Sequence, residues 1–104
     1  MRSITTTPMN EIAEVLCAIR DPKLMRRFME SILTPREWEE IAGRWELVKL
    51  LDQGISQRQV ATRLGMSLCK ITRGSRELKK RDSAFKTVLD KYARRHWIPQ
   101  GGHT

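Results

Sequence analysis

The chain has 104 residues, 39% of them hydrophobic, and a formal net charge of +8. This length fits a single domain, and the apolar content excludes a disordered chain. No stretch approaches the roughly 18 apolar residues of a membrane span, and no signal peptide opens the chain. We therefore expect a cytoplasmic protein that has no membrane partner.

The net positive charge of the chain comes from its second half. Residues 1–54 carry eight Lys/Arg against nine Asp/Glu, whereas residues 55–104 carry twelve against three. A half this basic indicates a polyanionic partner, and nucleic acid is the polyanion that it fits best. RNA is the weaker alternative, because the chain lacks an aromatic platform on which bases could stack.

Cysteine and histidine form no recognisable site. Cys17 and Cys69 have neither disulfide nor metal-ligand spacing, and His96 and His103 stand alone near the end. We expect both thiols to be reduced and no metal to be bound. The sequence also lacks a nucleophile with a base at suitable spacing and a glycine-rich phosphate loop, so it predicts no catalytic residues and no enzyme.

Periodicity divides the chain into three parts. Residues 1–8 have none and are expected to form a flexible arm, followed by a helical domain over residues 9–96 and a tail over residues 97–104. The first helix is predicted from Met9 to Arg20, where apolar residues recur at helical spacing.

Two further helices are predicted from their start signals. Asp21-Pro22 joins a capping residue to a proline at the first helical position. Thr34-Pro35-Arg36-Glu37 is a capping box, and the helix after it should run to Asp52 or Gln53. This third helix is apolar on most sides, which predicts a central position. The excess of apolar helix surface would be better buried by a partner subunit.

Residues 56–79 have the pattern of a helix-turn-helix, whose second helix enters the major groove of DNA. Ser56 can cap the first helix in a capping box with Gln59, Gly65 can end it in a left-handed conformation, and Ser67 can cap the second helix. The alternative is an ordinary helical hairpin whose basic residues form only a solvated face.

A last helix should be capped by Asp82. Its inward residues are predicted to be Phe85, Val88, Leu89 and Tyr92. With no strand pattern in the chain, we expect an all-α protein of six helices.

Three segments together resemble the tryptophan repressor family, over roughly residues 31–92. They are Leu33-Thr34-Pro35 with Glu37 and Arg44, then Ser56-Gln57-Arg58, and then Ile71-Thr72-Arg73-Gly74-Ser75 followed by Leu78-Lys79. The resemblance implies an intertwined all-α homodimer. It also implies a transcriptional repressor that uses L-tryptophan as corepressor to bind palindromic operators of tryptophan metabolism genes.

The resemblance also implies a ligand site. Arg73 would pair with the ligand carboxylate, Arg44 would lie on the other side of the indole, and Gly74 would let the ring approach the backbone. Leu33 and Thr34 would receive the amino-acid head group. On residue chemistry alone, Arg73 could instead contact a phosphate, and Arg44 could pair with Glu40 one turn earlier.

This sequence departs from the family pattern at the expected pocket. Glu77 stands where enterobacterial members have a serine, Lys70 replaces a threonine, and the linker from Arg44 to Ser56 is one residue shorter. A carboxylate at position 77 could accept the ligand ammonium or repel the ligand carboxylate. A helix-turn-helix regulator with another effector or none is therefore an alternative.

The predicted DNA contacts cluster on the helix-turn-helix. They are Gln57, Arg58, Ser67, Leu68, Cys69, Lys70, Thr72, Arg76, Lys79 and Lys80. Leu68 and Cys69 offer no strong fork for base edges, so specificity should rest partly on water and DNA shape. A further alternative is a protein-interaction module of the transcription machinery, using the helix that carries Trp38 and Trp45.

Overall fold

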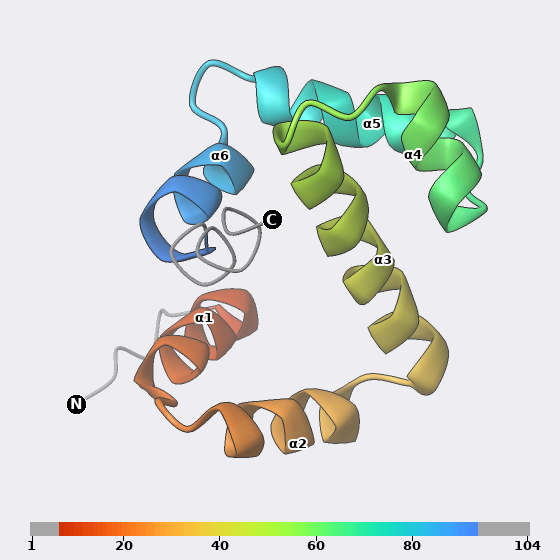
Figure 1. The fold of residues 1–104 in the computed structure, drawn as a ribbon. Coiled ribbons are helices and arrows are strands. Elements are labelled where there is room, and N and C mark those ends of the chain that lie inside the picture. Colours follow the sequence, from red (N-terminus) through yellow and green to blue (C-terminus); the bar gives the residue numbers. More distant parts are fainter. Residues whose placement is uncertain (1–6, 94–104) are drawn as a thin grey trace, which may run out of the picture. The chain divides into compact units, whose positions relative to one another are not determined.

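The structure, a computed structural model, describes residues 7–93, and this part of the chain is helical throughout, without a β-strand. The helices are α1 (Pro8–Ala18), α2 (Pro22–Ile32), α3 (Pro35–Asp52), α4 (Gln57–Leu64), α5 (Leu68–Lys79) and α6 (Ala84–Val88), which continues into a π-helical turn, η1 (Leu89–Ala93) (Figure 1). The predicted all-α class with six helices is confirmed. The predicted tail, His96 and His103 lie outside the described residues, as do residues 1–6 of the predicted arm.

The chain divides into two compact units, and the boundary between Glu39 and Glu40 lies inside α3. The first unit contains α1, α2 and the start of α3. The second contains the rest of α3 and the helices that follow it.

Capping explains where the helices of the first unit begin. α1 starts at Pro8, one residue before the predicted Met9, because the Thr7 hydroxyl accepts a hydrogen bond from the Asn10 N–H at 3.2 Å. The helix ends at Ala18, two residues earlier than predicted.

The other two predicted starts are confirmed. Asp21 Oδ1 accepts from the Lys23 N–H at 3.0 Å at the start of α2. At the start of α3, the Thr34 N–H donates to Glu37 Oε1 at 2.8 Å and the Glu37 N–H donates to Thr34 Oγ1 at 3.1 Å. These two bonds are the reciprocal capping box.

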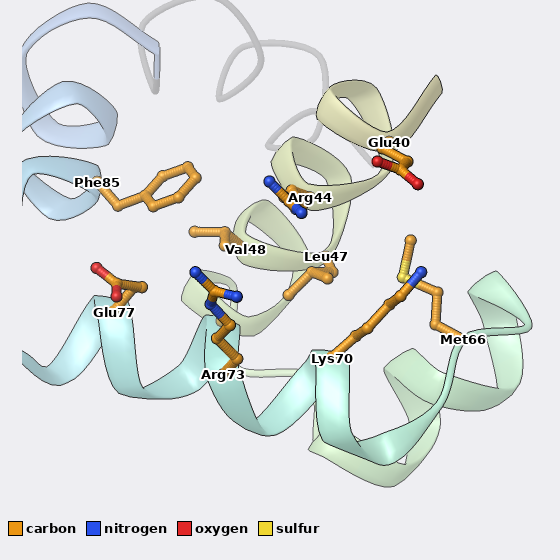
Figure 2. A pocket seen from close by; sticks show the side chains of 10 residues that line it. Glu40, Arg44, Leu47, Val48, Met66, Lys70, Arg73, Glu77 and Phe85 are labelled. Carbon is orange, nitrogen blue, oxygen red and sulfur yellow. The ribbon is translucent and has the colours of Figure 1, made fainter. Parts of the chain in front are cut away.

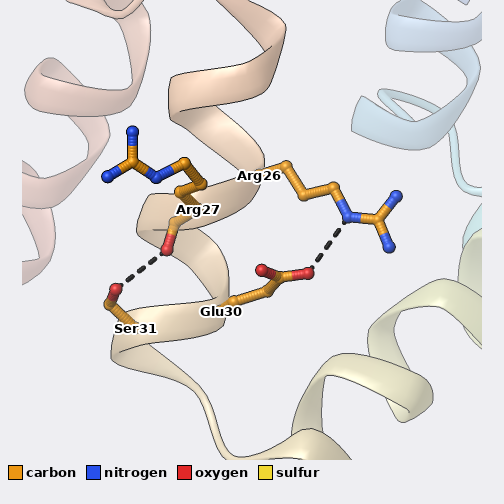
Figure 3. Close-up of polar contacts among 4 residues, drawn as sticks. All are labelled: Arg26, Arg27, Glu30 and Ser31. Carbon is orange, nitrogen blue, oxygen red and sulfur yellow. Dashed lines mark hydrogen bonds and ion pairs between the residues drawn. The ribbon is translucent and has the colours of Figure 1, made fainter.

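Helix α2 is amphipathic. Its polar side carries an ion pair between Arg26 Nε and Glu30 Oε2 at 3.1 Å, and the Ser31 hydroxyl donates to the Arg27 carbonyl at 2.9 Å (Figure 3). Its apolar side chains are not buried. Met25, Phe28 and Met29 are half-buried, and Leu24 and Ile32 are exposed. Neither α1 nor α2 contains a buried residue.

The hydrophobic core lies in the second unit. It consists of Leu47, Val48 and Leu50 from α3, Val60 from α4, Ile71 from α5, and Leu89 and Ala93 from η1. Only the second half of α3 contributes, since Ile41 is 38% exposed. The predicted central role of α3 therefore applies to its carboxyl-terminal half.

The helix-turn-helix has the predicted local geometry. Ser56 caps α4 and Ser67 caps α5, each through its hydroxyl. Gly65 lies between them with φ 64° and ψ 33°, the left-handed conformation that glycine adopts without a Cβ penalty. The Met66 N–H then donates to the Ala61 carbonyl at 3.1 Å and closes the end of α4.

The last helix departs from prediction. Its cap is Ser83 and not Asp82, because the buried Ser83 hydroxyl accepts from the Lys86 N–H at 3.0 Å. Val88 and Tyr92 are exposed, 41% and 67%, and were wrongly predicted to face inward. The buried positions of the π-helical turn are instead Leu89 and Ala93.

No helix in the described range 7–93 is both long enough and apolar enough to cross a bilayer.

Candidate ligand cavity and nucleic-acid interface

A cavity of about 490 Å³ lies between α3 and α5 in the second unit (Figure 2). Its lining residues are Glu40, Arg44, Leu47, Val48, Met66, Lys70, Arg73, Gly74, Glu77 and Phe85. Four of the residues predicted to bind a ligand are thus brought together: Arg44, Arg73, Gly74 and Glu77.

Two arginines approach the cavity from different helices. Arg44 extends from α3 and Arg73 from α5, and both lie over the apolar surface of Leu47 and Val48 (Figure 2). Leu47 is 2% exposed and Val48 1% exposed, so this surface is a fixed part of the core. A planar guanidinium can form two hydrogen bonds with a carboxylate and can also stack on an aromatic ring.

Glu77 adds a negative charge to the same wall of α5. It lies four residues after Arg73, on the same side of the helix. Its Oε2 forms an ion pair with Lys80 Nζ at 2.9 Å, with the two side chains 40% and 61% exposed, respectively. A guanidinium and a carboxylate one turn apart can bind the two charged groups of a zwitterion.

Lys70 was predicted to contact DNA and lines the cavity. It extends from the first turn of α5 into the space that Met66 and Glu40 also line (Figure 2). The cavity therefore holds three cationic and two anionic residues around its apolar floor.

Gly74 allows close packing of α5 on α3. A Cβ atom at this position would overlap Leu47 Cδ1 and lie 3.4 Å from Val48 Cγ2. The resemblance assigned this glycine to close approach of a ligand ring, and the structure adds a packing role that does not depend on any ligand.

Two features of the cavity's surroundings were not predicted from the sequence. Phe85 from α6 forms part of the wall and stacks on Trp45 of α3, with ring centroids 6.2 Å apart and an interplanar angle of 26°. The next residue, Lys86, forms an ion pair at 3.1 Å with Asp52 Oδ1, whose side chain is only 6% exposed. Both contacts depend on how the chain reverses after α5, which no local pattern specifies.

Leu33 and Thr34 belong to the first unit. The Leu33 N–H donates to the Met29 carbonyl at 3.0 Å, and Thr34 uses its hydroxyl and its N–H in the capping box with Glu37.

The remaining predicted DNA contacts lie along α4 and α5, and most of them are exposed. Arg58, Ser67, Leu68, Cys69, Arg76, Lys79 and Lys80 are all in the exposed class. Gln57 and Thr72 are half-buried, and they bond to each other: the Thr72 hydroxyl donates to Gln57 Oε1 at 3.2 Å. This bond connects α5, the second helix of the helix-turn-helix and its expected recognition helix, to the start of α4.

The all-helical fold and the helix-turn-helix of α4 and α5 place the chain in the class of helix-turn-helix proteins. Residues 8–93 match the family described as Trp repressor protein. The chain belongs to this family, whose members are transcriptional repressors and not enzymes.

Individual relatives agree with this assignment. The chain is 34% identical over 87 residues to the Trp operon repressor homolog of Chlamydia caviae, which covers 83% of this chain and 86% of that protein. It is 37% identical over 81 residues to the Trp operon repressor homolog of Xylella fastidiosa, covering 77% of this chain and 86% of that protein. No solved structure matches the chain.

Proposed function

We propose that the chain is a homodimeric repressor that binds palindromic operators of tryptophan metabolism genes when L-tryptophan occupies the cavity between α3 and α5. The observation that carries this proposal is the convergence of Arg44 and Arg73 on one cavity directly behind the recognition helix. Ligand binding there acts on the helix that contacts DNA.

The cavity chemistry supports an aromatic amino acid as the effector. Arg73 can pair with the carboxylate through a two-bond fork, and the Glu77 carboxylate in the same cavity can accept the ammonium group. The ring would lie over Leu47 and Val48, with Arg44 on its other side.

The charge distribution supports DNA as the partner. Twelve of the 20 Lys/Arg and only three of the 12 Asp/Glu belong to residues 55–104, which include α4 and α5. In a dimer, two recognition helices would enter successive major grooves about 34 Å apart. Occupation of the cavity would favour the spacing that fits both grooves, by shifting a population that already exists.

The apolar surface of the first unit supports a dimer. Met9, Val15, Leu24 and Ile32 are between 43% and 78% exposed on two helices without a buried residue. Exposed apolar surface of this extent is typical of an interface with another protein surface. A second copy of the same chain supplies a matching surface through two-fold symmetry.

The test is a gel-shift titration of the full chain with a library of palindromic duplexes, with and without L-tryptophan. We expect tighter binding with the amino acid. Arg73→Ala should abolish that gain while retaining salt-sensitive, non-specific binding. Arg63→Ala is the matched control, since it removes an exposed arginine of α4 that does not line the cavity. Equal loss of both kinds of binding in Arg73→Ala would identify Arg73 as a phosphate contact instead.

A second candidate is a repressor of the same family with another amino acid as effector. The observation that favours it is the presence of Glu40, Lys70 and Glu77 around the cavity, which suits a ligand with an additional charged group. Calorimetry with a panel of amino acids distinguishes the two candidate functions. Only a tryptophan-dependent repressor predicts that tryptophan binds more tightly than the other amino acids.

A further inference from the structure

Two hydroxyl side chains at the amino-terminal end of α5 form hydrogen bonds within the chain. The Ser67 hydroxyl accepts from the Lys70 N–H at 3.4 Å, and the Thr72 hydroxyl donates to Gln57 Oε1 at 3.2 Å. The Lys70 side chain lines the ligand cavity (Figure 2). Each of these hydroxyls therefore already uses part of its hydrogen-bonding capacity inside the chain.

Leu68 is an exposed apolar side chain at the amino-terminal end of α5. It is the first residue of α5, directly after the Ser67 cap, and it is 51% exposed. The other leucine, isoleucine, valine and methionine side chains of α4, α5 and the turn between them are buried or half-buried. The exposure of Leu68 is therefore specific to the end of the helix that enters the major groove.

An exposed leucine cannot recognise the hydrogen-bonding edges of bases, but the major groove offers one apolar group, the 5-methyl of thymine. We propose that Leu68 is a specificity-determining residue that contacts a thymine methyl in each half-site. This inference rests on the proposed function, since it requires a duplex in the groove next to α5. It adds a direct apolar contact to the expectation that specificity rests partly on water and DNA shape.

Cys69 is the alternative apolar contact, since it is exposed at the next position of α5. Its side chain is shorter and ends in a weak hydrogen-bond donor. Leu68 extends further from the helix and carries two terminal methyl groups. We therefore assign the contact to Leu68 and use Cys69 as the matched control.

The experiment uses deoxyuridine, which lacks the 5-methyl group of thymidine and has the same hydrogen-bonding groups. A duplex selected from the palindromic library by the full chain with L-tryptophan is resynthesised with each symmetric pair of thymines replaced in turn. We expect one pair to weaken binding by about fourfold for each methyl, or roughly fifteenfold for both half-sites. The other pairs should change the affinity by less than about twofold.

The variants assign the contact. Leu68→Ala should bind the thymidine and deoxyuridine duplexes equally and keep the dependence of affinity on salt, because its phosphate contacts remain. Cys69→Ala and Leu68→Met should keep the discrimination. Loss of discrimination in Cys69→Ala but not in Leu68→Ala would overturn the assignment, as would tight binding that is indifferent to every substitution. Failure to bind any duplex at low salt would overturn the proposed function as well.

Discussion

The two units of the chain use apolar residues differently. Within residues 7–93, all seven buried hydrophobic residues belong to the second unit, where they join α3, α4, α5 and η1. The first unit has helices of similar length, yet neither α1 nor α2 buries a side chain. Helices whose apolar residues remain uncovered are suited to contact with another chain, whereas a closed core is suited to hold a cavity and a DNA-binding helix in fixed geometry.

The largest expected effect comes from placing a charge on the first unit. Phe28→Asp should weaken dimerisation by at least about 100-fold, because removal of a large aromatic contact costs about 3 kcal/mol or more. Sedimentation equilibrium measures the dissociation constant. Lys23→Gln changes the charge by the same amount at an exposed position of α2, and this variant should leave the dissociation constant unchanged. An unaltered dimer in Phe28→Asp would show that this surface of α2 is not the interface.

The second largest effect concerns the core of the second unit. Gly74→Ala should lower the free energy of unfolding by about 2 kcal/mol, because the added Cβ overlaps Leu47, which is 2% exposed and has little room to move. Urea unfolding at a fixed protein concentration measures the change. Combination with Leu47→Ala should cost less than the sum of the two single changes, since the second substitution removes the overlapping atom. If the two changes in the free energy of unfolding added up exactly, the added Cβ at position 74 would not overlap Leu47.

A smaller loss is expected at the turn. Gly65→Ala should lower the free energy of unfolding by about 1 kcal/mol, because alanine is strained at φ 64°. Gly65→Asn should be milder, since asparagine tolerates the left-handed conformation. Equal effects of alanine and asparagine, measured by urea unfolding, would mean that the backbone conformation is not the cause.

The smallest expected effect distinguishes lysines that contact DNA phosphates from other lysines of residues 55–104. Lys79→Gln should reduce the slope of log K against log salt by about one for each phosphate that the lysine neutralises, with a modest change in affinity at fixed salt. Lys91→Gln removes an exposed lysine of η1 and should leave the slope unchanged. Filter binding at several salt concentrations measures the slope for each variant. Identical slopes in the two variants would show that Lys79 does not contact a DNA phosphate.

Local signals in the sequence predicted most of the fold. The starts of α2, α3, α4 and α5 were identified from Asp21, Thr34, Ser56 and Ser67, because a cap depends on residues within one helical turn. The same reasoning chose Asp82 over Ser83 for α6, since both residues can cap and only burial of the serine distinguishes them.

The candidate site was less accessible to such reasoning. Arg44, Arg73, Gly74 and Glu77 were found through resemblance to a family, and the structure places them on one cavity. Phe85 was predicted to face inward, but its stacking on Trp45 and the Asp52–Lys86 ion pair were missed, because these contacts join residues far apart in the sequence. The bond between Thr72 and Gln57 was missed for the same reason, although both residues are predicted DNA contacts.

The Asp52–Lys86 ion pair joins two segments next to the cavity, and only its carboxylate is shielded from water, since the Lys86 side chain is 48% exposed. It fixes the residue next to Phe85 to the end of α3, and its carboxylate is largely shielded from water. Counterions screen such a pair less than they screen exposed charges. In the proposed repressor, a rise in salt concentration should therefore weaken binding to DNA before it changes the shape of the cavity.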